Sequence, residues 1–186
     1  DDAYLELMSD VQQLLRYAWQ CNNRVSLPMS GTGSAAMEAS IANFIEEEET
    51  ILIAKKGYFG DRLVDMASRY KANVVVMEKE WGEAFSLDEI KFEIEKNKPS
   101  IFAIVHAETS TGVLQPLEGI GEICRKNNCL FLVDAVTSLG AVKLLVDDWK
   151  IDLAYSCSQK GLSCPPGLSP FTMNNRAEEK LNNRKS

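Results

Sequence analysis

Asp134 ends the most apolar stretch of the sequence, the run Leu130-Phe131-Leu132-Val133. A carboxylate beside such a stretch is unfavourable unless it has a partner, since burial of an unpaired charge opposes folding. One interpretation is an N-terminal cap for the segment that follows. The other is a charge partner for the pyridinium nitrogen of a bound cofactor, an arrangement by which proteins tune pyridoxal phosphate as an electron sink. The residue alone leaves both open.

Lys160 lies in the segment Ser156-Cys157-Ser158-Gln159-Lys160-Gly161. An isolated lysine is nearly always a solvated surface charge. This one follows an apolar strand-like run and has small polar neighbours, so we expect a desolvated amine with a lowered pKa. A partly neutral lysine of that kind can form a Schiff base.

A glycine loop, Ser30-Gly31-Thr32-Gly33-Ser34, precedes a helix-like segment. Small residues let backbone N–H groups approach an anion at a helix N-terminus, so a phosphate would fit there. Residues 31–36 also match the dinucleotide fingerprint G-x-G-x-x-G/A, but the next strand ends in Lys55-Lys56 where that fold wants an acidic residue. A dinucleotide-dependent oxidoreductase is therefore disfavoured, no Gly-Lys-Ser/Thr of a P-loop follows, and a turn without a ligand stays possible.

Bulk properties exclude several other classes. The net charge of −7 and pI near 4.9 argue against nucleic acid as a partner. Five cysteines without C-x-x-C spacing and a single histidine, His106, predict reduced thiols and no metal site. No apolar run approaches the ~20 residues of a membrane span, and no signal peptide is visible. We expect an intracellular protein, in the cytoplasm or in an organelle such as the peroxisome or mitochondrion, although the true start of the chain is expected to be missing.

The elements that must position these residues alternate along the chain. Residues 3–20 have apolar side chains at helical spacing, including Leu7 and Leu14, and predict a helix with one buried face. Further helices are predicted over 35–44, 61–70, 86–97 and 116–127, and strands over 25–29, 50–54, 73–77, 101–105, 129–133 and 153–156. The acidic run 46–49 reads as solvated, and the polar tail 176–186 as the possible start of a helix.

Most of the predicted strands are short continuous apolar runs, which is typical of strands buried on both faces. The predicted fold class is therefore α/β, with a mostly parallel open sheet flanked by helices. Ligands of such sheets bind outside the carboxyl ends of the strands. The segments that follow the predicted strands should meet at that edge: 31–34, 57–60, 106–112, 134 and 156–160.

At this point the sequence resembles the class V aminotransferases among the fold-type I pyridoxal-phosphate (PLP) enzymes, in particular the alanine–glyoxylate and serine–pyruvate aminotransferases. The resemblance covers nearly the whole chain and rests on SGTGSAAMEA (30–39), GYFGDR (57–62), HAETSTGVLQPL (106–117), VDAVTSLG (133–140) and SCSQKGLSCPPG (156–167).

The resemblance implies a role for individual residues. Lys160 would form the Schiff base with PLP and then act as base and acid in the proton shift of transamination. Asp134 would pair with the pyridine nitrogen, Val136 and Phe59 would pack on the two ring faces, and Thr109 would reach the phenolate oxygen. The phosphate would be held by Thr32, Gly33, Ser34 and Gln159. Relatives usually have tryptophan where Phe59 stands, so the stacking is expected to survive without any polar contact from an indole N–H. Relatives often have histidine where Ser34 stands, and serine can still donate to the phosphate.

The resemblance also implies partners and missing parts. The substrates would be a small amino acid (alanine or serine) and a 2-oxo acid (glyoxylate or pyruvate), and the full-length protein would be a homodimer. Residues 1–186 would form the PLP-binding large domain, without the C-terminal small domain that carries an arginine for the substrate carboxylate. His106 is expected to hydrogen-bond behind the site rather than act as a base, and Glu108 stays ambiguous.

Three alternatives to an aminotransferase are weighed against the sequence. A cysteine desulfurase would need a mobile cysteine well after the lysine, and Cys164 is too close to Lys160. A lyase or decarboxylase of the same class depends on residues outside this chain. A catalytically incomplete fragment remains the third.

Overall fold

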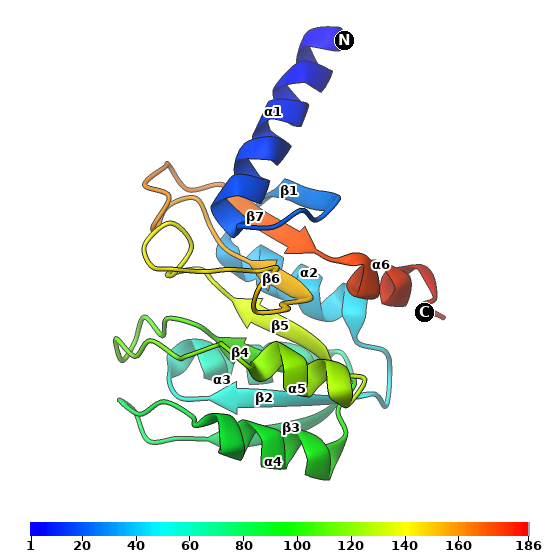
Figure 1. Cartoon of the computed structure of the whole chain (residues 1–186), viewed down its shortest axis with the longest axis vertical. Helices are drawn as coiled ribbons and strands as arrows, with labels where there is room; N and C mark the ends of the chain where they lie inside the picture. The colour runs from blue at the N-terminus through cyan, green and yellow to red at the C-terminus, as the bar shows by residue number, and fades with distance from the viewer. Residues whose placement is uncertain (186) are drawn as a thin grey trace.

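The computed structural model describes residues 1–185, in which seven strands form one sheet with helices on both faces (Figure 1). Along the sheet the order is β1-β7-β6-β5-β4-β2-β3. β7 is antiparallel to both of its neighbours, so the other six strands all point the same way. The strands are β1 (Val25–Ser30), β2 (Thr50–Lys55), β3 (Asn73–Glu78), β4 (Ile101–Val105), β5 (Leu130–Asp134), β6 (Leu153–Tyr155) and β7 (Leu168–Met173). The predicted α/β class with a mostly parallel sheet is confirmed.

The helices divide between the two faces of this sheet. α4 (Leu87–Asn97) and α5 (Ile120–Lys126) cover one face, the side toward the viewer in Figure 1. α2 (Gly33–Phe44), α3 (Tyr58–Arg69) and α6 (Asn175–Asn182) cover the other. Each face therefore encloses its own apolar core.

Continuous apolar runs in the strands serve both cores at once. In β2, Leu52 and Ala54 pack toward α4 and α5, whereas Ile51 and Ile53 pack toward α2 and α3, and all four are fully buried. The same alternation holds in β4 and β5. Full burial of one such aliphatic side chain stabilises the fold by roughly 1.5–3 kcal/mol, so these strands are fixed at the centre of the sheet.

α1 (Asp2–Trp19) corrects one expectation. Leu7 and Leu14, which the helical pattern placed on a buried face, are 59% and 67% exposed. The helix projects from the body, and only its last turns reach the core, through Leu15 and the fully buried Trp19 (Figure 1). The apolar spacing is real, but among residues 1–185 the first half of α1 has no surface to pack against.

Several boundaries also differ from the predictions. α3 begins at Tyr58 instead of residue 61, and α5 at Ile120 instead of residue 116, because residues 116–119 form an irregular turn that ends at Gly119 with φ +86°. The pattern missed β7, whose Pro170 argues against a strand. Pro170 lies opposite Pro28 of β1, so at that pair neither residue has an N–H to satisfy.

The remaining expectations concern the ends of the chain, the thiols and membranes. The tail does contain a helix, α6. The acidic run 46–49 is solvated only in part, since Glu47 and Glu48 are exposed whereas Glu46 and Glu49 are half-buried. All five cysteines are free, and only Cys164 is exposed. Within the part of the chain that the structure describes, none of the helices combines the length and apolar character needed to cross a bilayer.

Candidate active site

A cavity of about 170 Å³ opens at the carboxyl ends of β1, β5 and β6. Because these strands are parallel, their following loops meet at one edge of the sheet. Eight of the nine predicted site residues line this cavity: Thr32, Gly33, Ser34, Phe59, Asp134, Val136, Gln159 and Lys160. Met37 and Cys157, which the sequence did not point to, complete the lining.

The glycine loop presents the N-terminus of α2 to this cavity. Thr32 is the N-cap residue, yet its side chain makes no capping hydrogen bond, and the first turn of α2 contains no acidic residue. The loop is held in place from behind, since Gly31 N–H donates to Gly167 O (2.9 Å) and Ser169 Oγ donates to Gly31 O (3.0 Å). An uncapped and pre-positioned helix N-terminus is suited to bind an anion such as phosphate.

Asp134 forms a buried, hydrogen-bonded carboxylate at the end of β5. Its Oδ1 accepts the Val136 N–H (2.9 Å), and its Oδ2 accepts the Tyr155 O–H (2.8 Å). Burial raises the pKa of Asp134 to about 6, although both hydrogen bonds favour the charged form and act against that rise. At neutral pH the group is therefore an anion held in a fixed orientation.

Phe59 reaches the cavity from the first turn of α3, and Glu108 fixes that turn. Both carboxylate oxygens of Glu108 accept from α3, Oε1 from Phe59 N–H and Oε2 from Gly60 N–H, each at 3.3 Å. Ser110 Oγ donates to Oε1 at 2.8 Å. Gly57 permits this approach, because a Cβ there would lie only 2.5 Å from Glu108 Cγ. Glu108, left ambiguous by the sequence, is thus an acidic cap supplied from a distant loop.

Val136, Gly33 and Cys157 pack closely at one side of the cavity. A Cβ on Gly33 would lie 3.0 Å from Val136 Cγ2 and 3.4 Å from Cys157 Cβ. Glycine at this position therefore lets the backbone of α2 approach the loop after β5. Burial raises the pKa of the Cys157 thiol, so Cys157 acts here as a small apolar wall.

Lys160 lies at the rim of the cavity, and its environment corrects the sequence-based expectation. We expected a desolvated amine, but both Gln159 and Lys160 are exposed in residues 1–185. The turn that carries them is nevertheless well fixed, since Ser156 Oγ donates to Ala135 O (2.9 Å) and Ser158 Oγ to Pro165 O (2.6 Å). The lysine stands on a rigid loop with no cover over its amine from this part of the chain.

Thr109 is the one predicted residue that does not line the cavity. It is exposed, and its Oγ1 shares a hydrogen bond of 2.6 Å with Thr137 Oγ1. Thr137 directly follows Val136, so Thr109 lies beside the site rather than in it.

His106 is buried behind the edge of the sheet. Its ring makes an edge-on contact with Trp149 at 5.9 Å, and its Nδ1 has no hydrogen-bond partner among the described residues. We expected the His106 side chain to form a hydrogen bond behind the site, and its Nδ1 does not form one. The link to the site comes from the His106 backbone N–H, which donates to Asp134 O (2.9 Å). Burial lowers the pKa of His106 to about 4, so the ring is neutral at pH 7.

Two buried residues near Asp134 escaped the sequence analysis. Tyr155 is paired with Asp134 in the β5–β6 ladder, and Lys56 donates from Nζ to Val105 O at 2.7 Å. Tyr155 gave no signal because it reads as an ordinary apolar strand residue. Lys56 did carry a signal, since it belongs to a pair of lysines, Lys55 and Lys56, that follows the apolar strand 50–54. Without the fold, neither the buried member of the pair nor its neighbours could be named.

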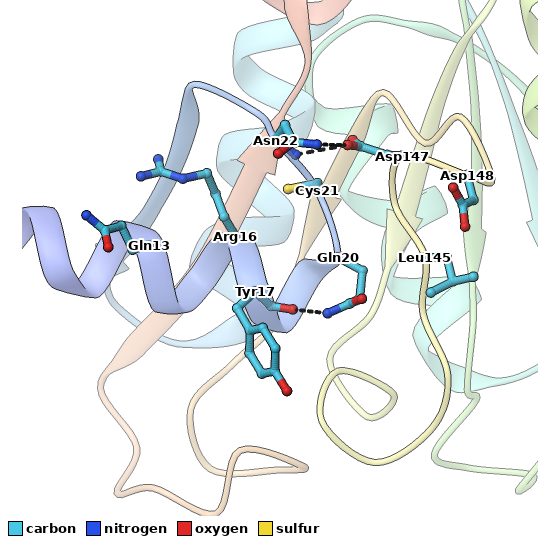
Figure 2. Close-up of a pocket in the computed structure, with 9 residues that line it drawn as sticks. All are labelled: Gln13, Arg16, Tyr17, Gln20, Cys21, Asn22, Leu145, Asp147 and Asp148. Carbon is cyan, nitrogen blue, oxygen red and sulfur yellow. Dashed lines mark hydrogen bonds between the residues drawn. The ribbon is translucent and has the colours of Figure 1, made fainter.

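A larger cavity, of about 510 Å³, lies elsewhere, between the C-terminal part of α1 and the loop that contains Asp147 (Figure 2). Its walls are mostly polar, and none of the predicted site residues contributes to it. Asp147 Oδ2 accepts from Asn22 through both the backbone N–H (2.9 Å) and Nδ2 (3.0 Å), as Figure 2 shows. That carboxylate ties α1 to the loop, so we assign this hollow a structural origin.

Comparison with known proteins agrees with this geometry. The profile of the family "Aminotransferase class-V" matches residues 6–186. The (S)-ureidoglycine–glyoxylate transaminase of Bacillus subtilis is 45% identical over 185 residues, which cover 100% of this chain and 44% of that protein. The alanine–glyoxylate aminotransferase of Mus musculus is 40% identical over 182 residues, covering 98% of this chain and 44% of its own length.

Solved structures give the same result. The crystal structure of an alanine–glyoxylate aminotransferase from Nostoc sp. superposes with a TM-score of 0.98 at 58% identity, over 100% of this chain and 49% of that one. The present chain thus spans less than half the length of these relatives. With a matched profile over almost all of its residues and the same fold, the chain belongs to the class-V aminotransferase family.

Proposed function

We propose that this chain is the cofactor-binding part of a PLP-dependent aminotransferase, in which Lys160 carries the cofactor. The observation that carries the proposal is the single cavity that joins the uncapped N-terminus of α2, the buried Asp134 carboxylate and the Lys160 amine. These three groups are separated in the sequence and meet only through the parallel sheet. The family membership and the transaminase names of the relatives support the same activity.

The residues present fit PLP. A phosphate would lie at the N-terminus of α2 with Thr32, Gly33 and Ser34, with Gln159 nearby on the rim. Phe59 and Val136 would hold the two faces of an aromatic ring, and Asp134 Oδ would face its nitrogen. When bound, PLP supplies an electron sink for a substrate carbon that has lost a proton. We also propose Thr109, through its link to Thr137, as a neighbour of the ring oxygen.

Two side chains would move or hold protons. Ionised Asp134 would hold a proton on the ring nitrogen, and its hydrogen bonds from Val136 and Tyr155 keep the carboxylate oriented for this. Lys160 Nζ would hold the cofactor and, as a neutral amine, would take a proton from the substrate carbon and return it two atoms away, in the 1,3-proton shift of transamination. That role needs a lysine that is partly shielded from water, so residues outside this chain would have to cover Lys160.

Small substrates are proposed from the names of the relatives. Alanine–glyoxylate and ureidoglycine–glyoxylate transaminases share glyoxylate in their names. We therefore propose a small 2-oxo acid, glyoxylate or pyruvate, as acceptor and alanine or serine as donor. (S)-Ureidoglycine is a second candidate donor, favoured by the 45% identity to the Bacillus subtilis enzyme.

A homodimer is proposed for the full-length natural protein. The apolar side chains on α1 that lack cover in this chain include Leu5 (64% exposed), Leu14 (67%) and Tyr17 (76%). A second copy would remove this surface from water. Light scattering on the full-length protein would show a mass of two chains, whereas a mass of one chain would overturn this point.

The decisive experiment identifies the lysine that PLP modifies. The full-length natural protein is loaded with PLP, reduced with borohydride and digested, and the labelled peptide is found by mass spectrometry. We expect pyridoxyl label on Lys160 and none there in Lys160→Ala, with Lys143→Ala as a matched control that keeps the label. Label spread over surface lysines, or no label, would overturn the proposed function. Transfer assays with each donor and glyoxylate then assign the substrate.

A further inference from the structure

Lys56 is an unusual residue in this fold, because it is a buried lysine that the proposed chemistry does not use. Its side chain is 1% exposed, and among residues 1–185 it is the only lysine or arginine in the fully buried set. The preceding residue, Lys55, shows the ordinary alternative, since it points outward and pairs with Asp61 (3.0 Å) and Glu78 (2.7 Å). Lys56 turns inward at the carboxyl edge of the sheet instead.

The Lys56 amine lies near enough to the two buried carboxylates of the site for each of them to act on its charge. Nζ donates to Val105 O (2.7 Å), and Val105 is the β4 partner of Asp134 in the ladder. Glu108 follows three residues later on the same strand-end loop and is 1% exposed. Both Asp134 and Glu108 attract the Lys56 charge, and Glu108 opposes ionisation of Asp134. The arrangement is one buried cation with two buried anions.

The other polar groups nearby do not replace this cation. His106 faces Lys56 but is neutral at pH 7, since burial and the Lys56 charge lower its pKa. The neutral Tyr155 hydroxyl donates a hydrogen bond to the Asp134 carboxylate and carries no charge. Arg62 of α3 acts on Tyr155 but is not among the charges that act on Asp134 or Lys56. Two carboxylates in one low-dielectric site cannot both ionise readily without a compensating charge.

We propose that Lys56 is a positioning residue of the cofactor site, whose buried ammonium balances the two buried carboxylates and so favours the ionised form of Asp134. Glu108 caps the turn that carries Phe59, and ionised Asp134 can pair with a protonated ring nitrogen. The role of Lys56 in cofactor binding rests on the proposed function. The charge balance among Lys56, Glu108 and Asp134 involves only residues of this protein and can be tested without a cofactor. Burial lowers the pKa of Lys56 to about 8, so the amine is still mostly protonated at pH 7.

The test follows the titration of Asp134 in the cofactor-free, full-length natural protein. Aspartate is labelled with ¹³C at the carboxyl carbon, and the Asp134 signal is identified by its loss in Asp134→Asn. In the parent protein we expect a midpoint near 6. In Lys56→Met and Lys56→Gln the midpoint should rise, by up to about one unit, as expected for loss of a nearby charge. Lys55→Gln, a matched control one residue away, should leave it unchanged.

A double substitution separates charge balance from packing. In Lys56→Gln with Glu108→Gln, one cation and one anion are removed together, so the midpoint should return toward the parent value. Lys56→Gln retains an N–H donor for Val105 O, and it gives the same comparison if the Met variant fails to fold. A parental midpoint in Lys56→Gln would overturn the inference, as would a double variant shifted as far as the single one.

Binding of PLP supplies the link to function. Because the ligand titrates identically with every variant, differences in the pH dependence of its dissociation constant report on the protein. If binding requires ionised Asp134, a rise of its midpoint by about one unit predicts about twofold weaker binding at pH 7 and about tenfold weaker binding at pH 5 in Lys56→Gln. Failure of the parent protein to label Lys160 would overturn the proposed function while the Asp134 titration still decides the role of Lys56.

Discussion

Tyr155 and Asp134, paired across neighbouring strands β5 and β6, share a buried hydrogen bond of 2.8 Å from the Tyr155 hydroxyl to Asp134 Oδ2. Both side chains are almost completely inaccessible to water, Tyr155 at 0% and Asp134 at 2%. The bond favours the ionised form of a carboxyl group whose burial favours the neutral form. Tyr155 therefore supports the charge that the proposed cofactor site requires.

Tyr155→Phe should weaken the site through Asp134. Loss of the hydroxyl leaves one carboxylate oxygen without its donor, which typically destabilises a protein by about 1–3 kcal/mol. We expect that loss at pH 8, together with an Asp134 pKa above its parental value of about 6 and weaker PLP binding at pH 7. Urea unfolding and a PLP titration measure the two effects. Tyr70→Phe, whose hydroxyl bonds exposed Glu38, is the control and should change neither; an equal loss in both variants would refute the argument.

Asp134→Asn should stabilise the cofactor-free protein at neutral pH. In the folded state Asp134 keeps its proton up to about pH 6, whereas an unfolded aspartate loses it near 3.8. The unfolded state therefore binds fewer protons between these values, and the Asp134 contribution to stability is lost as pH rises through 6. Asparagine cannot ionise, so the free energy of unfolding of the variant, measured relative to the parent protein, should be roughly 2.5 kcal/mol higher above pH 7 than at pH 4.

Measuring this effect needs the free energy of unfolding of both proteins at several pH values between 4 and 8, without cofactor. PLP binding should weaken strongly in the same variant, because the amide cannot pair with a protonated ring nitrogen. A stability difference that stays constant with pH would show that Asp134 is already ionised at pH 4 in the folded protein.

Glu108→Gln should loosen the start of α3. The charged cap accepts the N–H groups of Phe59 and Gly60, and an anion at a helix N-terminus contributes about 0.3–1 kcal/mol beyond its hydrogen bonds. We expect roughly 1 kcal/mol lower stability and faster hydrogen exchange of the amides at 58–61. Glu118→Gln, an exposed glutamate near α5, is the control. Unaltered exchange at 58–61 would mean that Glu108 does not hold this turn.

Arg176→Met should destabilise the fold away from the site. Arg176 Nη1 donates to Asp152 Oδ2 at 2.8 Å, and Asp152 is fully buried. Removing the cation leaves a buried carboxylate with only its bonds from Phe131 N–H and Asn174 Nδ2. Since Arg176 is itself 31% exposed, solvent screening reduces the loss to about 2 kcal/mol. Arg69→Met, which breaks an exposed pair with Asp65, should lose less than about 0.5 kcal/mol, and equal losses would contradict the assignment.

The sequence by itself determined the class of fold and most of the cavity wall. Continuous apolar strands such as Ile101–Val105 predict a parallel sheet, because only burial on both faces tolerates them. Once the sheet is parallel, residues that follow its strands must meet at one edge, which is why Asp134, Phe59 and Lys160 could be grouped in advance. The local apolar pattern and the parallel direction of the strands are enough to predict this grouping.

Only the tertiary structure decided which side chains support these groups. Tyr155 reaches Asp134, Glu108 reaches the backbone of Phe59, and Lys56 reaches Val105, the strand partner of Asp134. These contacts depend on the strand order and register, neither of which the apolar pattern specifies. Tertiary structure also decided β7, because a strand that contains proline is recognised only once its proline is seen opposite another proline. It likewise decided α1, whose apolar Leu14 stays exposed. A periodic pattern fixes the face that a residue occupies, whereas its partner depends on contacts between segments far apart in the chain.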